Sequence, residues 1–247
     1  KTAVGAPPTL TRPIRMRRQG LERIRTLQAR LLDHYGPQGW WPGESPFEIL
    51  AGTILVQRTR WRNAELALGN LSTAGLLSPT GVVSCPAGKL QRLIRPAGFY
   101  RQKTRSLQGV AQWILANGGI DGVSALPTPD LRRELTALAG VGQETADCIL
   151  LYVFDRPVFI ADAYARRLLI RLGWVSADEA ADYRRLAELM RSVEGDSDFF
   201  NELHALIVTH GKKVCGRRPV CGRCILRRHC RTGLIRREAT AHRDSCR

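Results

Sequence analysis

Residues 138–154 are LAGVGQETADCILLYVF, and the fold expected for the whole chain follows from them. Two glycines flank Val141 after an apolar stripe that ends at Leu138. A second stripe follows the turn with the spacing i, i+3, i+4, i+7 and i+8: Ala146, Ile149, Leu150, Val153 and Phe154. This is the period of a helix with one buried face. The pattern predicts a helix, a tight turn and a second helix over residues 131–154.

Gly140 and Gly142 give this turn a specific chemistry. Because they lack side chains, they admit backbone angles closed to other residues, and they let a phosphate approach the amides of the second helix. A hairpin of this kind binds the DNA backbone without reading the base sequence. For Gly-Val-Gly alone, an ordinary corner between helices with glycine at the C-cap is an equally good interpretation.

The rest of the chain is predicted to be helical as well. Residues 45–48 (Ser-Pro-Phe-Glu) form a capping box, and Thr128 is a second predicted cap, placed before Pro129. Apolar and polar residues alternate with a period of two, as in a strand, over no more than a few residues at a time, so the predicted fold class is all-α. The pair Trp40-Trp41, in GPQGWWPG, is interpreted as a packed turn rather than as a ligand platform.

Composition favours a polyanionic partner. The chain carries a formal net charge of +16. Because 44% of its 247 residues are hydrophobic, a wholly disordered basic tail protein is excluded. Of the 38 cations, 33 are arginine and 5 are lysine, and guanidinium groups suit phosphate. The alternative explanation of the positive charge is that the arginines simply cover solvated helix faces.

No apolar run is long enough to span a membrane and the start has no signal-peptide core, so we expect an intracellular protein without a membrane partner.

Four of the seven cysteines form the pattern C-x5-C-x2-C-x5-C: Cys215, Cys221, Cys224 and Cys230. Four thiolates so close together indicate one polynuclear centre or one zinc ion. Zinc sites usually have two short knuckles, whereas one C-x2-C is present, so an iron-sulfur cluster fits better and coincidental reduced cysteines fit least. No role is predicted for Cys85, Cys148 and Cys246.

Together these motifs resemble the endonuclease III family of helix-hairpin-helix DNA glycosylases. The resemblance covers most of residues 20–232 and rests on FEILAGTILVQRT (47–59), IRPAGFYRQKTRSL (94–107), LAGVGQETADCILLYVFDRPVFIADAYARRLL (138–169) and HGKKVCGRRPVCGRCILRRHC (210–230). GWWPG, VGQETAD and DAYARRLL look most like the endonuclease III-related branch that includes 3-methyladenine glycosylases.

The resemblance implies two helical lobes that flank a DNA-binding cleft. A six-helix barrel with the hairpin would span residues 46–156. The second lobe, built from residues 14–45 and 157–232, would carry a 4Fe-4S cluster. Residues 1–13 are expected to form a flexible basic arm and residues 233–247 a tail.

The resemblance also implies the site residues. Asp162 matches the catalytic aspartate, and its place at an evident helix start favours the ionised carboxylate. Gln57 falls where the family fills the hole left by a flipped base. The remaining DNA contacts are expected from the hairpin and from residues 216–220, called here the cysteine loop: Gly140, Val141, Gly142, Thr145, Arg217 and Arg218.

One position departs from the family. Bifunctional members have a lysine two residues after the second hairpin glycine, which forms a Schiff base with the sugar, and this chain has Glu144 there. We therefore expect a monomeric, monofunctional glycosylase of base excision repair, cytoplasmic and associated with the nucleoid. It would act on damaged double-stranded DNA, with Asp162 as catalyst and Glu144 orienting water. Alkylated purines are the first substrate expectation. The alternatives are a non-catalytic binder of damaged or branched DNA and a glycosylase/lyase that uses another lysine.

Overall fold

The computed structural model describes residues 13–41 and 43–235, and every regular element in this part of the chain is helical. The α-helices are α1 (Pro13–Tyr35), α2 (Pro46–Leu55), α3 (Trp61–Thr73), α4 (Pro79–Ser84), α5 (Ala87–Leu93), α6 (Tyr100–Ala116), α7 (Gly119–Ser124), α8 (Thr128–Ala137), α9 (Gln143–Phe154), α10 (Ala163–Leu172), α11 (Tyr183–Met190) and α12 (Ser197–Lys213). Three 3-10 turns are η1 (Arg95–Ala97), η2 (Cys221–Arg223) and η3 (Arg227–His229). The all-α prediction is confirmed. The predicted arm, apart from Pro13, and residues 236–247 of the tail lie outside the described residues.

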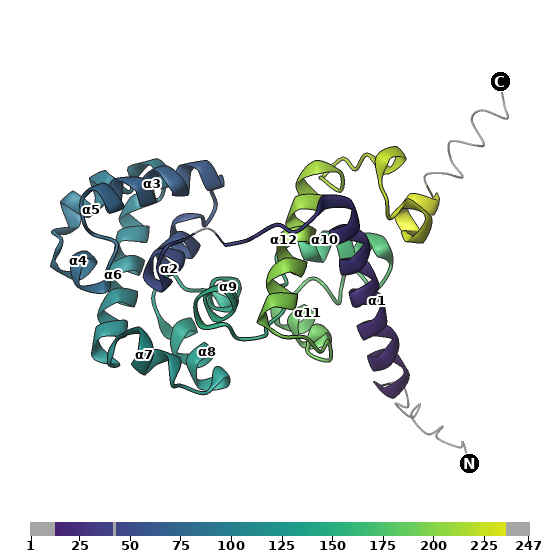
Figure 1. Cartoon of the computed structure of the whole chain (residues 1–247), viewed down its shortest axis with the longest axis horizontal. Coiled ribbons are helices and arrows are strands. Elements are labelled where there is room, and N and C mark those ends of the chain that lie inside the picture. The colour runs from purple at the N-terminus through teal and green to yellow at the C-terminus, as the bar shows by residue number, and fades with distance from the viewer. Residues whose placement is uncertain (1–12, 42, 236–247) are drawn as a thin grey trace, which may run out of the picture.

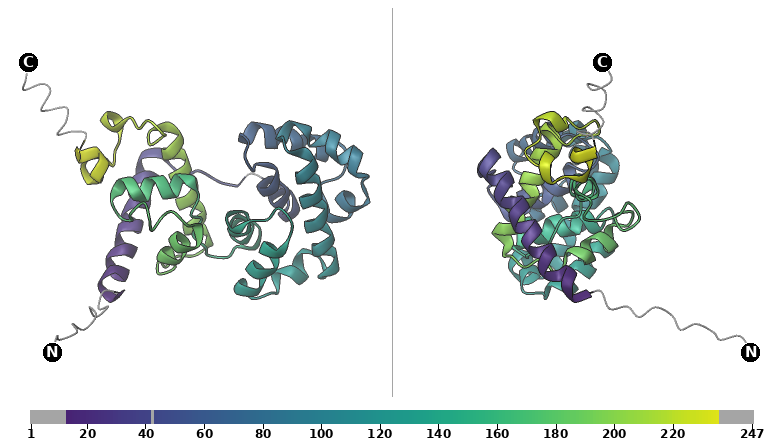
Figure 2. Two further views of the ribbon diagram at one scale, coloured as in Figure 1. Left: turned by 180° about the vertical axis from the view of Figure 1, so that it is seen from behind. Right: turned by 90° about the vertical axis from the view of Figure 1, so that its right-hand side faces the viewer.

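The helices form two groups, each around its own hydrophobic core (Figure 1). Helices α2 to α9 enclose one core, whose largest buried side chains include Leu50, Ile54 and Leu107. The other core is built from α1, α10, α11, α12 and the cysteine segment. The chain passes between the groups once after α1 and once after α9, and Figure 2 shows α1 on the outer side of its group. The predicted lobe boundaries stay predictions.

One of the two predicted helix starts has the expected cap. Ser45 Oγ accepts a hydrogen bond from the Glu48 amide at 3.2 Å, and the Glu48 carboxylate accepts one from the Glu44 amide at 2.9 Å. The prediction for Thr128 is wrong, because α8 begins at Thr128 itself and Pro127 is its N-cap. Pro127 already has the extended conformation that a cap needs (φ −57°, ψ 143°), so the helix starts one residue early.

The predicted hairpin is present as α8, a turn and α9, but its two glycines differ. Gly140 has a φ of +82°, and a Cβ placed there would lie 2.0 Å from Ser106 Oγ. Gly142 has an ordinary φ of −83° and serves as the N-cap of α9, and a Cβ there would have no neighbour within 4 Å. The expectation of unusual backbone angles therefore holds for Gly140 and is wrong for Gly142, where the missing side chain leaves open space beside the first amides of α9.

We expect Gly140→Ala to destabilise the protein by about 2–5 kcal/mol, because alanine is strained at a positive φ and its methyl group would meet Ser106. Denaturant unfolding measures this change. Gly142→Ala is the matched control and should alter the unfolding free energy by less than about 1 kcal/mol. Equal stability of the two variants would contradict the role assigned to Gly140.

Candidate active site

Asp162 lies at the N-terminus of α10 and is 8% exposed. Its Oδ1 accepts a hydrogen bond from the Ala165 amide at 2.7 Å, so Asp162 is the N-cap as well as the predicted catalytic residue. Its Oδ2 lies 3.7 Å from Nε2 of His204 on α12. One oxygen is therefore anchored by the backbone, and the other faces the imidazole of His204.

An aromatic cluster surrounds His204. The Trp40 ring stacks on the His204 ring with their centroids 5.9 Å apart, and the Tyr152 hydroxyl shares a hydrogen bond with His204 Nδ1. Trp41 packs against Tyr152 and, edge to face, against Trp61, in both cases with ring centroids 5.1 Å apart. The tryptophan pair does pack, as interpreted, and Trp40 packs against His204, the residue that faces Asp162. No local pattern announces this, since residue 40 and residue 204 meet only in the folded chain.

Two atoms of this cluster have unused hydrogen-bonding capacity. Trp41 Nε1 and His204 Nε2 are buried and have no hydrogen-bond partner among the described residues. Nearby, the Lys212 ammonium lies over the Trp40 ring, 5.5 Å from its centroid. The cluster thus combines aromatic faces with polar atoms next to the carboxylate of Asp162.

Glu144 belongs to the same neighbourhood. It lies in the first turn of α9, and the pKa of its carboxyl is raised, first by burial among protein atoms and then by the negative charge of Asp162. Residue Glu144 as a whole is nevertheless exposed to solvent. The structure therefore brings together the two carboxylates that the sequence singled out as catalytic.

A buried ion pair and two hydrogen bonds connect the hairpin to the segment before Asp162. Asp147 on α9 is 1% exposed. Arg132 on α8 pairs with its Oδ1 at 2.8 Å, and the Tyr183 hydroxyl on α11 donates to its Oδ2 at 2.8 Å. The same hydroxyl accepts a hydrogen bond from the Ala161 amide at 3.4 Å. Burial raises the pKa of Asp147 to about 6, although Arg132 and Tyr183 act in the opposite direction.

Gln57 is joined to the hairpin. Its Nε2 donates to the Gly140 carbonyl at 3.1 Å and to Thr145 Oγ1 at 3.0 Å. Because Val141 is 4% exposed, this residue can offer a ligand its backbone but not its side chain. The predicted DNA contacts of the hairpin and Gln57 therefore form one connected unit.

Phe99 is a candidate that the sequence reasoning missed. It is 58% exposed, and the Arg58 guanidinium lies 5.9 Å from its ring centroid. Both residues have positive φ, +55° for Arg58 and +45° for Phe99. A large aromatic side chain directly after Gly98 in a loop was the available signal. Exposed, strained residues next to Gln57 are typical of a binding surface.

The four motif cysteines line a single pocket together with residues of α10 and α12: Cys215, Cys221, Cys224 and Cys230. Among the described residues, no three His, Cys, Asp or Glu side chains lie close enough to hold one metal ion. In a polynuclear cluster each thiolate binds a different iron, so the ligands stand farther apart than around one zinc ion. An all-thiol donor set arranged around one pocket fits an iron-sulfur cluster in this respect.

Helix α10 anchors the cysteine loop. Arg171 donates to the carbonyls of Cys215, Gly216 and Arg217 at 3.1, 2.7 and 3.0 Å. Arg171 Nη1 also lies 3.2 Å from Cys215 Sγ. Arg217 and Arg218 lie within this loop and are exposed. The helix that begins next to Asp162 thus ends by holding the predicted phosphate contacts.

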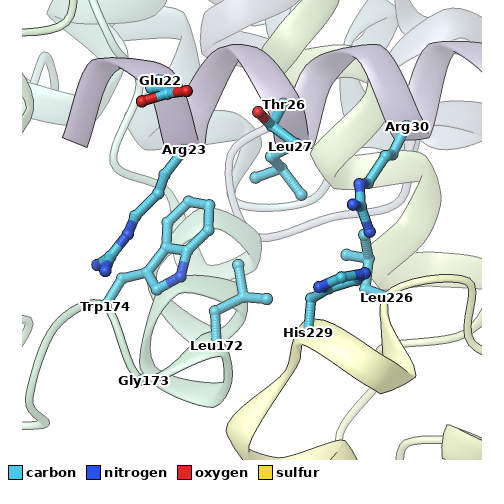
Figure 3. A pocket seen from close by; sticks show the side chains of 10 residues that line it. All are labelled: Glu22, Arg23, Thr26, Leu27, Arg30, Leu172, Gly173, Trp174, Leu226 and His229. Atoms are coloured by element: carbon cyan, nitrogen blue, oxygen red, sulfur yellow. The ribbon is translucent and has the colours of Figure 1, made fainter. Parts of the chain in front are cut away.

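A separate pocket of about 520 Å³ lies between α1, the end of α10 and the segment between Cys224 and Cys230. In Figure 3, Arg30 and His229 face one another and Arg23 extends beside Trp174. The pocket adjoins Leu172 at the C-terminus of α10, about 15 Å along the helix from Asp162. The candidate active site therefore does not include this pocket.

No helix in the described chain is long and apolar enough to cross a membrane.

We expect the stability of Asp147→Asn relative to the native protein to depend on pH. The folded-state pKa of about 6 lies above the ordinary value of 3.8. The native carboxyl therefore contributes stability below pH 4 that is lost as the pH rises through 6, by roughly 3 kcal/mol. Unfolding free energies measured for both proteins from pH 4 to 7 test this, since the other carboxyls cancel in the difference. A difference independent of pH would show that Asp147 is not buried as described.

Known proteins identify the family. The model of the "HhH-GPD superfamily base excision DNA repair protein" matches residues 51–193. A protein of Methanocaldococcus jannaschii named "Putative DNA repair glycosylase" is 40% identical over 87% of this chain and 99% of its own length. Endonuclease III of Sulfolobus acidocaldarius is 31% identical over 75% of this chain and 81% of its own.

A solved structure agrees in fold. The 3-methyladenine DNA glycosylase of H. pylori bound to 1,N6-ethenoadenine has a TM-score of 0.63 and 25% identity, covering 80% of this chain and 97% of that one. Because the family model matches more than half of the chain and two relatives exceed 30% identity, this chain belongs to the HhH-GPD superfamily of base excision DNA repair proteins, as an endonuclease III-like DNA glycosylase.

Proposed function

We propose that the protein is a monofunctional glycosylase that hydrolyses the N-glycosidic bond of a damaged base flipped out of duplex DNA. One observation carries this proposal: the carboxylate of Asp162 is anchored by one oxygen beside Glu144, where a lyase would need an amine. Cleavage breaks the bond between C1′ and the base nitrogen, and the electron pair leaves with the base. The sugar becomes an oxocarbenium-like cation that a nearby carboxylate stabilises.

The second half of the reaction adds water to C1′. Asp162 Oδ2 is the oxygen left to orient this water, and the raised pKa of Glu144 suits it to accept the water's proton. A carboxylate cannot form an imine, so the product is an intact strand with an abasic site. The Ala165 amide keeps Asp162 in place.

Alkylated purines are the substrate class that we propose. Such bases carry a positive charge, which aromatic faces and carboxylates attract. The site offers both, in Trp40, Trp41, Asp162 and Glu144. A cationic base also departs without being protonated, so the site needs no strong general acid. The likeness to a solved 3-methyladenine DNA glycosylase supports this choice.

The proposed DNA interface combines three surfaces. The open space at Gly142 lets a phosphate reach the first amides of α9. Gln57, with Phe99 beside it, fills the hole left by the flipped nucleotide. Arg217 and Arg218 bind the backbone without reading sequence. We propose that a monomer acts on duplex DNA in this way, in the cytoplasm with the nucleoid.

We further propose that the four cysteines hold a 4Fe-4S cluster. When bound, the cluster supplies a structural tie within the segment 215–230. The chain's own contribution is to present the loop: Arg171 holds three loop carbonyls, and Arg217 and Arg218 extend from that loop. This arrangement joins the phosphate contacts to the helix that begins at Asp162.

One observation favours a second function. Lys212 lies 5.5 Å from the Trp40 ring centroid, so an amine does lie at the edge of the aromatic cluster. If that amine reached C1′ of the sugar, the enzyme would be a glycosylase/lyase despite Glu144. The two functions differ in whether a strand break needs alkali.

We expect the purified protein to create alkali-labile sites in duplexes that contain 3-methyladenine, and no strand breaks without alkali. Asp162→Asn should lower the single-turnover rate at least about 100-fold while the protein still binds the duplex, because the carboxylate acts on the transition state. Undamaged duplex is the control. A protein that binds lesion duplexes but yields no alkali-labile site on any lesion would be a binder instead.

Borohydride trapping separates the two glycosylase functions. We expect no trapped adduct from the native protein, because Glu144 cannot form an imine. Glu144→Lys provides a positive control for an amine at this position. Strand breaks without alkali, accompanied by an adduct that Lys212→Met abolishes, would assign lyase activity to Lys212 and overturn the monofunctional proposal.

Protein prepared without oxygen should be brown and contain about four irons and four acid-labile sulfides per chain. Replacing Cys221 by Ser should lower both contents and weaken duplex binding, with a smaller salt dependence, because the loop that carries Arg217 and Arg218 is no longer held. Cys85→Ser is the matched control and should retain the cluster. A colourless preparation that contains zinc would refute the cluster.

A further inference from the structure

Lys103 is a buried cation without an acidic partner. It lies on α6 and is 3% exposed, and none of the ion pairs within the described residues includes it. Its Nζ donates three hydrogen bonds, to the carbonyls of Leu55 at 2.8 Å, Gln57 at 2.9 Å and Ala97 at 2.8 Å. Every N–H of the ammonium is therefore used on main-chain oxygen. Burial lowers the pKa of Lys103 to about 8.

The three carbonyls belong to two turns that flank the proposed DNA surface. Leu55 ends α2, whose C-terminal carbonyls carry partial negative charge that offsets the cost of burying a cation. Gln57 follows in the turn and precedes Arg58. Ala97 ends η1, two residues before Phe99. The ammonium thus ties the turn of Gln57 to the turn of Phe99.

The side chain of Gln57 is held from the opposite direction. Its amide donates to the Gly140 carbonyl and to Thr145 Oγ1 on the hairpin, at 3.1 and 3.0 Å. The backbone of Gln57 is therefore fixed by α6 and its side chain by the hairpin. A residue that enters a duplex from a fixed turn loses less conformational entropy on binding than one on a free loop.

We propose that Lys103 is a positioning residue for base flipping: its buried ammonium holds the Gln57 carbonyl so that the Gln57 side chain stands at the point where it enters the duplex. This inference rests on the proposed function, in which Gln57 fills the hole left by the flipped base. A lysine that merely capped α2 would support folding and would have no specific connection with Gln57.

A double-mutant cycle separates these two roles. The proteins are native, Lys103→Met, Gln57→Ala and the double variant. The probe is a duplex with 2-aminopurine beside the lesion, whose fluorescence rises as the base unstacks, and single-turnover excision is measured in parallel. We expect each single variant to lower the amplitude of unstacking and to slow excision about 10-fold or more. In the Gln57→Ala background, Lys103→Met should slow excision by less than about 3-fold, because the Gln57 side chain through which Lys103 acts is absent.

Melting curves and a matched control exclude a general effect. Lys89 on α5 is exposed in the same helical group, and Lys89→Met should behave as native. Lys103→Gln keeps two N–H donors, and it replaces Lys103→Met in the cycle if the latter does not fold. We expect it to fall between native and Lys103→Met in unstacking.

The outcomes distinguish the inference from the function beneath it. Suppose that Gln57→Ala slows flipping, and that Lys103→Met slows excision by the same factor in the Gln57→Ala background as it does alone. The enzyme then remains a glycosylase, and the positioning role of Lys103 is wrong. The same holds if a folded Lys103 variant unstacks the probe as well as the native protein. If Gln57→Ala leaves unstacking unchanged, the role of Gln57 in the proposed function fails, and the role of Lys103 fails with it.

Discussion

Helix α9 packs into both hydrophobic cores, and the relative placement of all the site residues depends on this. Ile149 and Leu150 are buried in the core of α2 to α9, whereas Leu151 and Tyr152 are buried in the core of α1 and α10 to α12. Because apolar burial drives the packing on two sides at once, α9 cannot turn without breaking contacts in both. Its N-terminus carries the hairpin and Glu144, so these are fixed relative to Asp162.

Local chemistry explains why part of the fold and site could be predicted. The hairpin is specified within residues 131–154 by helical periodicity on either side of glycine. Asp162 directly precedes the residues of α10, and a carboxylate at a helix start is a local signal. The spacing of the cysteines likewise places them around one pocket. In each case, neighbours in sequence are also neighbours in space.

The remainder depends on contacts that no window of sequence contains. Trp40 meets His204 across the chain, and Lys103 binds carbonyls as far as 48 residues away. The predicted cap at Thr128 failed because Pro127 takes that place, a competition between adjacent residues that either could win. At Gly140 the sequence suggested a free backbone, but the reason for glycine also includes Ser106 on another helix.

The identity of residue 144 is the reason why we propose a glycosylase without lyase activity. A lyase of the family needs an amine at this position to attack the sugar, and Glu144 offers a carboxylate there. A second carboxylate lies in the same neighbourhood: burial, and then the negative charge of Asp162, raise the pKa of Glu144, which makes Glu144 a better proton acceptor. A base that arrives with a positive charge is attracted by these carboxylates, and when it departs it leaves a sugar cation in its place. In the proposed reaction the site therefore faces a positive charge before and after the bond breaks, and this is the reason why we propose a cationic alkylated purine rather than a neutral base as the substrate.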